Sequence, residues 1–135
     1  MKKIALFLVL MTTLLSCSVD EPDRYTNYVL PIESYTLPET FKVNTTHEVK
    51  LKYQKPTACY NYNGIYYYSE NSTRTIAIYA NVKEGDVCSD VLPPLSEVSF
   101  NFAPTTKGTY TFKFYKGPDA EGKDTFEEVE IEVTE

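Results

Sequence analysis

The stretch from Cys59 to Tyr68, CYNYNGIYYY, holds five tyrosines in ten residues of a chain that has no tryptophan. Tyrosine presents a flat apolar ring with a hydroxyl at its tip, so a row of such rings can bind a protein surface or stack on a sugar ring. Asn61, Asn63 and Asn81 add amide hydrogen-bonding groups to the same region. The stretch is therefore the first candidate for a binding site. Its candidate binding residues are Tyr60, Tyr62, Tyr66, Tyr68 and Tyr79.

Residues suited to enzyme chemistry or metal binding are sparse. The only histidine, His47, stands at the start of an expected strand, and we interpret it as a surface residue. The loop 116–124 carries three carboxylates, but their spacing does not fit an EF-hand and lysines flank them, so we expect a solvated turn. No nucleophile motif and no phosphate-binding glycine loop is present. The sequence predicts no catalytic residue, no metal and no cofactor.

The N-terminal 17 residues have the order of a secretory signal. Met1-Lys2-Lys3 is followed by the apolar run 4–11, which is too short to span a bilayer alone, and then by small residues. The junction Leu14-Leu15-Ser16-Cys17 resembles the lipobox of bacterial prolipoproteins. The resemblance implies that residues 1–16 are removed as a signal peptide and that Cys17 is acylated; an ordinary signal peptide or an uncleaved anchor is the alternative. More than one acyl chain holds a protein firmly in a membrane.

The residues after Cys17 predict where the anchored protein goes. The acidic cluster within 18–23 is similar to the export signal of surface-displayed lipoproteins in Bacteroidota-type bacteria, although a plain polar tether over 17–27 would have the same composition. Loss of Lys2 and Lys3 leaves 11 basic (13 − 2) against 19 acidic residues, a net charge of −8, which opposes binding to nucleic acid. We expect an outer-membrane lipoprotein held by lipid, facing outside the cell or, as the alternative, the periplasm.

Two cysteines remain once Cys17 carries lipid. In an oxidising compartment Cys59 and Cys88 form an even pair, and we predict a disulfide between them. The closed loop of 30 residues (88 − 59 + 1) implies a stabilisation of at most about 3.5 kcal/mol.

Apolar and polar residues alternate with period two along most of the chain, which is typical of strands with one buried face. We expect about seven strands at 29–37, 41–44, 47–54, 59–69, 73–83, 97–103, 109–116 and 126–134, the first two counting as one if Pro38 only interrupts it. Seven short strands in a domain spanning 28–135 predict an antiparallel two-sheet sandwich of immunoglobulin-like or fibronectin type III-like shape, with a small open barrel as the alternative. Tyr110 lies where such domains often place a tyrosine corner. The domain resembles small immunoglobulin-like sandwich lipoproteins of the same bacterial group.

The tyrosines belong to an expected hairpin of 59–69 with 73–83. A turn at 70–73 pairs residues of the two strands whose sequence numbers sum to 143. One face then carries Ile65, Tyr67 and Asn63, which lie opposite Ile78, Ile76 and Ala80 in that order. The other face would then carry all five candidate tyrosines, with Tyr60 opposite Lys83, Tyr62 opposite Asn81 and Tyr79 over Gly64. A bulge at Gly64 would exchange the faces on one side of it.

Two interpretations of this tyrosine face stay open. Tyrosine is a favoured strand residue, and its ring can simply cover the sheet. The rings can equally form a recognition surface for a protein or a glycan. We therefore hypothesise a lipid-anchored surface binding or accessory module; the alternatives are a structural envelope subunit that packs against an outer-membrane protein and, less favoured, an enzyme or enzyme inhibitor.

Overall fold

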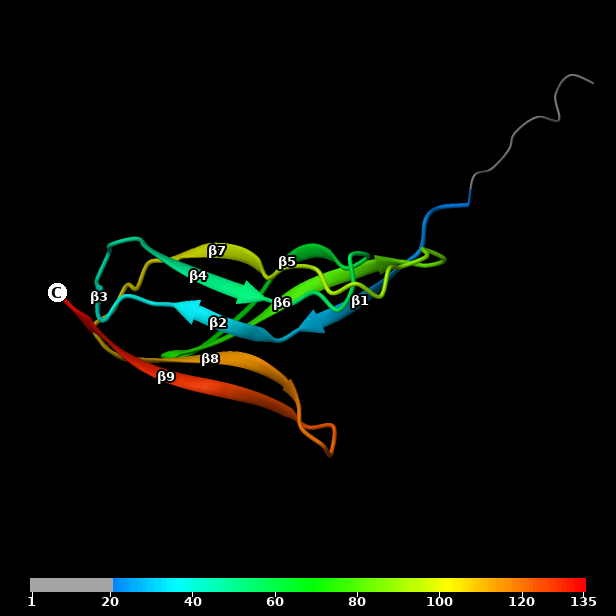
Figure 1. Cartoon of the computed structure of the whole chain (residues 1–135). Coiled ribbons are helices and arrows are strands. Elements are labelled where there is room, and N and C mark those ends of the chain that lie inside the picture. Colours follow the sequence, from blue (N-terminus) through cyan, green and yellow to red (C-terminus); the bar gives the residue numbers. More distant parts are fainter. Residues whose placement is uncertain (1–20) are drawn as a thin grey trace, which may run out of the picture.

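The computed structural model describes residues 21–135, so the predicted signal peptide, the predicted lipobox and Cys17 lie outside the described residues. The described part of the chain folds into strands joined by turns and loops, without a helix (Figure 1). The strands are β1 (Tyr25–Leu30), β2 (Ile32–Thr36), β3 (Phe41–Lys42), β4 (His47–Tyr53), β5 (Asn61–Glu70), β6 (Thr73–Lys83), β7 (Ser96–Phe102), β8 (Gly108–Pro118) and β9 (Asp124–Thr134).

The strands form two separate sheets, which confirms the predicted sandwich. The larger sheet has the order β1-β6-β8-β9-β3 with β5 also paired to β6, and the smaller sheet has the order β2-β4-β7. Two pairings differ from the expected antiparallel pattern, because β6 pairs with β8 and β3 pairs with β9 in parallel. The larger sheet is therefore mixed.

The expected first strand, 29–37, is two strands in different sheets. Proline has no backbone N–H to give to a ladder, and Pro31 stands where the chain leaves β1 of the larger sheet and enters β2 of the smaller one. β1 also begins at Tyr25, inside the segment 17–27 that the sequence suggested as tether.

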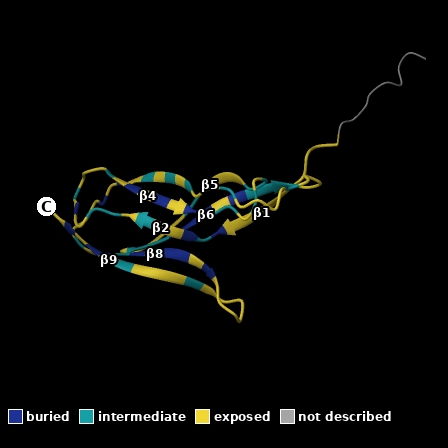
Figure 2. Ribbon diagram, viewed as in Figure 1, coloured by how far each residue is buried: buried dark blue, intermediate teal, exposed yellow. Residues whose placement is uncertain are grey.

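The core fills the space between the sheets with alternate residues of most strands (Figure 2). Phe41, Phe102 and Phe112 form its aromatic centre, with ring centroids 5.0 to 5.7 Å apart. The largest side chains with less than 2 % exposure are Tyr53, Phe41, Phe112, Phe114, Ile32, Leu51, Ile76, Ile78 and Val49. The period-two pattern thus predicted the buried faces of β4, β6 and β8 correctly.

Two strands pair with the same edge of β6. Residues 78–83 of β6 pair with β1, and residues 73–76 of the same strand pair with β8. Between these two ladders, at Ala77, the sheet forks: β1 leads into the smaller sheet while β8 and β9 diverge toward their turn (Figure 1). The fork gives the outer face of the larger sheet a depression.

Polar contacts join the two sheets along the flank formed by β2, β8 and β9. The Tyr35 hydroxyl donates to Glu127 Oε1 at 2.7 Å, and its ring stacks on Phe114 at 4.0 Å between centroids. Lys116 Nζ donates to the carbonyl oxygens of Ile32 and Glu33 at 2.7 and 3.1 Å. This flank of the sandwich is closed.

Tyr110 is buried at the expected corner. Its hydroxyl lies 2.8 Å from Thr106 Oγ1, four residues upstream, and the Arg74 guanidinium lies over its ring at 4.9 Å. The hydroxyl is therefore satisfied by a side chain of the preceding turn, whereas the hydroxyl of a tyrosine corner bonds to backbone.

His47 is not the isolated surface residue that the sequence suggested. Its Nε2 accepts a hydrogen bond from the Lys42 backbone N–H at 3.0 Å, and its ring packs edge-on against Phe41. The half-buried imidazole thus closes the turn between β3 and β4, where Asn44 has a positive φ of 58°.

The carboxylates of the loop 116–124 are partly used in building the turn. Asp119 Oδ1 accepts from the backbone N–H groups of Glu121 and Lys123, both at 2.9 Å. Within residues 21–135 no group of three or more histidine, cysteine or acidic side chains is arranged to hold a metal ion. The loop is a solvated hairpin turn, as predicted.

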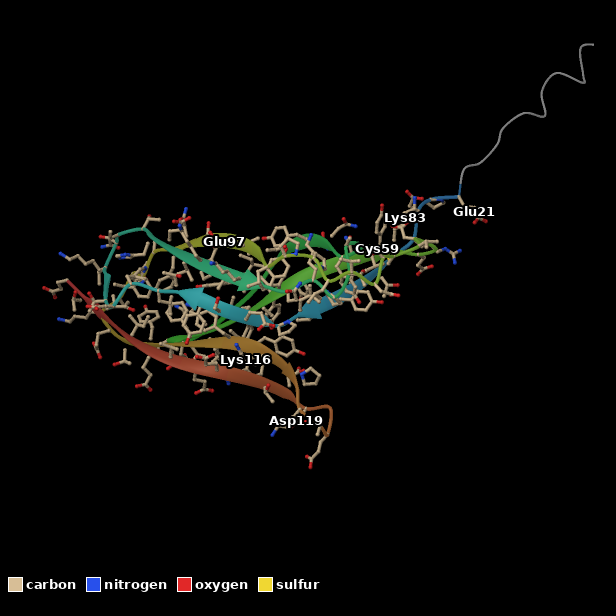
Figure 3. All side chains as sticks on the ribbon, in the orientation of Figure 1. Glu21, Cys59, Lys83, Glu97, Lys116 and Asp119 are labelled. Carbon is tan, nitrogen blue, oxygen red and sulfur yellow. A yellow bond between two sulfur atoms is a disulfide. The ribbon has the colours of Figure 1, made fainter. Side chains whose placement is uncertain are left out.

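Cys59 and Cys88 form the predicted disulfide, with Cα atoms 5.7 Å apart. It connects the segment before β5 to the long loop 84–95 between β6 and β7. Cys59, Lys83 and Glu21 lie at the same end of the molecule (Figure 3). The bridge therefore fixes the loop at the end where the chain enters the domain.

Removing the disulfide should destabilise the domain without changing its fold. We expect Cys59→Ser/Cys88→Ser to lower the free energy of unfolding by up to about 3.5 kcal/mol, because the unfolded chain regains loop freedom. Urea unfolding measures the loss, and Ser89→Ala in the same loop is the control. Equal stability of the double variant and the parent protein would contradict the prediction.

The Tyr35 contact should give a distinct step in the alkaline titration. Burial, followed by the hydrogen bond and the charge of Glu127, raises the pKa of Tyr35 from 10.0 to about 12. Since this pKa is higher in the folded chain, the contribution of Tyr35 to stability is complete below pH 10 and is lost as the pH rises toward about 12.

Phenolate absorbance measures that step. Tyr35→Phe should remove the step near pH 12, and Glu127→Gln should move it to lower pH. Glu128→Gln is the matched control, because Glu128 pairs with Lys113 instead (3.2 Å). Persistence of the step in Tyr35→Phe would assign it to another tyrosine.

Candidate functional site

The β5–β6 hairpin has the predicted turn but not one continuous register. From Gly64 to Glu70 the pairs sum to 143, as expected, with Ile65 opposite Ile78 and Tyr66 opposite Ala77. A bulge between Tyr62 and Gly64 then shifts the pairing by one residue, so that Tyr62 lies opposite Ala80. Gly64 has a φ of +126°, which side-chain-bearing residues rarely adopt.

The bulge divides the five candidate tyrosines between two faces. Tyr66, Tyr68 and Tyr79 stay on the outer face of the larger sheet, as predicted. Tyr60 and Tyr62 do not, because the extra residue turns them to the inner side. There Tyr60 packs against the core, with its ring 5.0 Å from Tyr28, and Tyr62 lies 6.4 Å from the buried Tyr53. The expected pairings of Tyr60 with Lys83, Tyr62 with Asn81 and Asn63 with Ala80 are wrong for the same reason.

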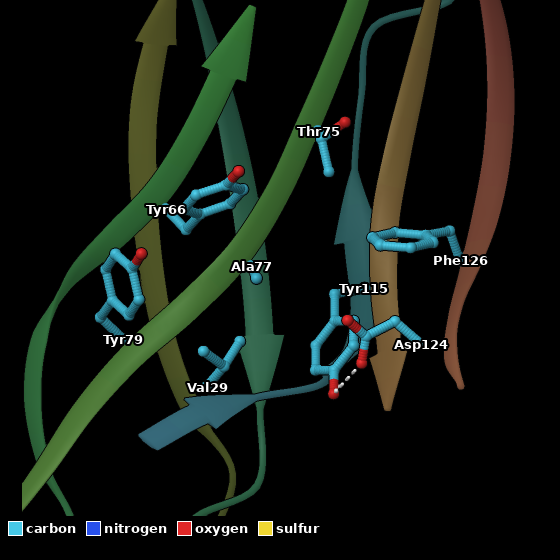
Figure 4. A pocket seen from close by; sticks show the side chains of 8 residues that line it. All are labelled: Val29, Tyr66, Thr75, Ala77, Tyr79, Tyr115, Asp124 and Phe126. Carbon is cyan, nitrogen blue, oxygen red and sulfur yellow. Dashed lines mark hydrogen bonds between the residues drawn. The ribbon is translucent and has the colours of Figure 1, made fainter. Parts of the chain in front are cut away.

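A groove of about 270 Å³ lies on the outer face, at the fork of the larger sheet (Figure 4). Its floor is Ala77, a buried small residue of the central strand β6. Aromatic rings form a wall on each side of this floor. One wall belongs to β5 and β6, and the other wall belongs to β8 and β9. The lining residues are Val29, Tyr66, Thr75, Ala77, Tyr79, Tyr115, Asp124 and Phe126.

The aromatic walls are built as two ring pairs. Tyr66 and Tyr79 meet edge to face, with centroids 5.6 Å apart and an interplanar angle of 84°. Tyr115 and Phe126 are 5.7 Å apart and tilted at 57°. Such pairs stabilise each other beyond the area they bury, so both walls are fixed before any ligand arrives. Tyr79 and Phe126 remain 38 % and 36 % exposed, which leaves ring surface for a ligand.

Asp124 provides the negatively charged group of the groove. Its Oδ1 accepts a hydrogen bond from the Tyr115 hydroxyl at 3.2 Å (Figure 4). Burial, with the Asp124 carboxylate as the second cause, raises the pKa of Tyr115, so this hydroxyl stays protonated as a donor. Among residues 21–135 no donor reaches Asp124 Oδ2, which is thus available to a ligand.

One cation stands beside the groove. Lys113 Nζ lies over the Phe126 ring at 5.1 Å and forms an ion pair with Glu128 at 3.2 Å. This contact orients Phe126, because the ammonium group is attracted to the ring face.

Sequence reasoning found one wall of the groove and missed the other. Tyr66 and Tyr79 line it; Tyr68 is on the same face, opposite Thr75, but outside the lining. The missed residues are Val29, Tyr115, Asp124 and Phe126. The alternation of strand residues could have placed two of them on the outer face. Tyr115 follows the inward-facing Phe114, and Phe126 is separated by an even number of positions from the outward-facing Glu128 and Glu130.

Comparison with known proteins agrees with this architecture. Residues 49–131 match the family described as the ORF11 beta-sandwich domain. The chain belongs to this family. The match to the ORF11 beta-sandwich domain begins in β4 and ends in β9, so it includes both cysteines of the disulfide and every lining residue of the groove except Val29. No curated protein and no solved structure matches the chain.

The described residues contain no helix that is long and apolar enough to cross a membrane.

Proposed function

We propose that this protein is a lipid-anchored binding module whose outer-face groove binds the sugar ring of a glycan. The observation that carries the proposal is the pair of aromatic walls around Ala77, with a carboxylate at one end. Sugar rings offer an apolar face for stacking and hydroxyl groups for hydrogen bonds. The groove supplies both partners: ring surface from Tyr79 and Phe126, and an acceptor oxygen from Asp124.

The size and composition of the groove support a small ligand. Small-molecule sites are usually concave, mostly apolar and roughly 300–1,000 Å³ in volume, and this groove of about 270 Å³ is close to the lower limit. A single sugar ring, or the end of a chain, fits this size better than a broad protein surface does. A protein ligand is the other outcome of the test below.

The sequence supports a lipid anchor for this module. The junction at Cys17 resembles a lipobox, and only three residues separate Cys17 from Glu21, the first described residue. In the structure the chain enters the domain beside the end of β6, where Asp23 pairs with Lys83 at 2.7 Å. We propose that the domain stands on the outer face of a Bacteroidota-type outer membrane with this end toward the lipid.

A second candidate function, a structural subunit that packs against an outer-membrane protein, is favoured by the loop 84–95. Four apolar side chains of this loop are more than half exposed. They are Val87 (100 %), Val91 (74 %), Leu92 (62 %) and Leu95 (54 %). Exposed apolar groups of this kind mark contact surfaces.

Removing one ring from either wall should weaken glycan binding. We expect Tyr66→Ala and Phe126→Ala each to weaken binding on a glycan array by roughly tenfold or more, because stacking surface is lost. Tyr68→Ala is the matched control: it removes a 50 % exposed ring from the same strand and face but outside the groove.

Thermal unfolding separates binding from stability in these variants. Each ring pair contributes about 0.5–1.5 kcal/mol beyond the area that it buries. Neither Tyr66 nor Phe126 is fully buried, so both variants should still fold. Glycan binding that survives both substitutions, or a protein ligand retained by the groove, would contradict the glycan proposal.

Lipidation is tested separately. On detergent partitioning, the native protein should enter the detergent phase and Cys17→Ser the aqueous phase, because acyl chains bury roughly 0.8 kcal/mol per methylene. Ser18→Ala is the control for a change at the same junction. A bare thiol at Cys17 in the mass spectrum of the native protein would disprove the anchor without affecting the groove.

A further inference from the structure

The flank opposite the closed one carries two free strand edges. Within residues 21–135, β5 pairs only with β6 in the larger sheet, and β7 pairs only with β4 in the smaller sheet. The two edges lie over one another, since the Tyr67 ring of β5 meets the Phe100 ring of β7 at 5.7 Å. Every second residue of an edge strand directs its N–H and C=O groups away from its partner.

Beyond its bulge, the free edge of β5 lacks the features that usually prevent pairing. Edge strands are commonly protected by lysine, by proline, by short length or by a bulge, and the bulge of β5 lies before Gly64, so the stretch 65–70 remains regular. β5 has ten residues, no lysine, arginine or proline, and only one charge, Glu70 at its end. The closed flank differs: there Tyr35 and Lys116 join the sheets with hydrogen bonds.

A groove of about 440 Å³ lies between these two edges, and both apolar and polar side chains line it. Ile65 and Tyr67 form its wall on β5, and Phe100 and Phe102 form its wall on β7. Tyr67 is 43 % exposed, although it is on the inner face of its strand. A strand added to β5 would place every second side chain in this groove.

Arg74 gives the groove a charge preference. It lines the groove next to Ser69, with its guanidinium 5.8 Å from the Phe102 ring, and Nη1 donates to the backbone oxygens of Asn71 and Thr73. Among the described residues no carboxylate lies within 4.0 Å of it, whereas several surface lysines are paired. A carboxylate of a bound partner would complement this charge.

We propose that the β5–β7 flank binds an extended segment of a partner protein, which pairs with β5, buries alternate apolar side chains between the sheets and places an acidic group at Arg74. A second copy of this chain fits less well. If two β5 strands paired antiparallel about Tyr66, Glu70 of one would lie opposite residue 62 of the other, at the end of β5 away from Arg74.

A library of random twelve-residue peptides displayed on phage, selected against the purified full chain, tests this proposal. Enriched peptides should have apolar residues at every second position and an aspartate or glutamate near one end. Tyr67→Lys points a charge into the groove and should weaken their binding by roughly tenfold or more. Tyr68→Lys, the same change on the opposite face of β5, should leave binding within about twofold.

Two further variants test the preference for an acidic group and replace Tyr67→Lys if that variant does not fold. Arg74→Gln should remove the acidic preference but keep the alternation. If Tyr67→Lys fails to fold, Ser69→Glu supplies an inward charge at an exposed position and neutralises Arg74. Failure to enrich any peptide, or binding that survives both Tyr67→Lys and Ser69→Glu, overturns the proposal. Self-association that Tyr67→Lys blocks in sedimentation would assign the edge to a second copy, and also overturns it.

Discussion

The sharing of one edge of β6 by β1 and β8 determines most of the architecture. Each partner takes half of the edge, so neither can extend past Ala77 without displacing the other. β1 must then leave the sheet, which it does at Pro31, where a ladder hydrogen bond cannot be donated. β8 and β9 are left to diverge. The outer groove and the contacts of Tyr35 and Lys116 with the other sheet both follow from this divergence.

The other edge of β6 has the opposite character. β5 pairs along nearly all of it, so the hairpin extends the sheet by one strand and ends in a free edge. No side-chain hydrogen bond comparable to those of Lys116 and Tyr35 joins β5 to β7 among the described residues, where the Tyr67 and Phe100 rings meet. The sandwich is therefore asymmetric, closed by polar contacts on one flank and hollowed on the other by a groove with both aromatic and polar side chains.

Sequence reasoning predicted the elements of this fold better than their pairing. Alternation identified the inward rows of β4, β8 and β9, because side-chain parity depends only on local geometry. The split at Pro31 and the parallel pair of β6 with β8 depend on contacts between distant segments, which alternation does not encode. The turn at Asn71 was predictable from the residue type; its φ is 52°, a conformation that asparagine tolerates.

Prediction from the sequence has the same limit at the candidate site, where one extra residue in β5 changes which face a side chain occupies. Tyr66 and Tyr79 were correctly placed on the outer face, whereas Tyr60 and Tyr62 were not, since the bulge at Gly64 reverses parity on one side only. The second wall came from β8 and β9, and no local pattern in the sequence indicates that these strands lie beside the tyrosine hairpin. Phe126 and Tyr115 had the right parity, but only the fork brings them within reach of Ala77.

The direction in which the chain enters the domain has a mechanical consequence. Residues 21–24 precede β1 at one end of the domain (Figure 1), and β1 is held to β6 by six consecutive register pairs. A pull on this end, resisted by anything held on the larger sheet, would load that ladder in shear, so its hydrogen bonds would have to break together and not one after another. The cross-link between Cys59 and Cys88 lies beside this entry point, where it keeps the neighbouring loop from peeling away under the same load.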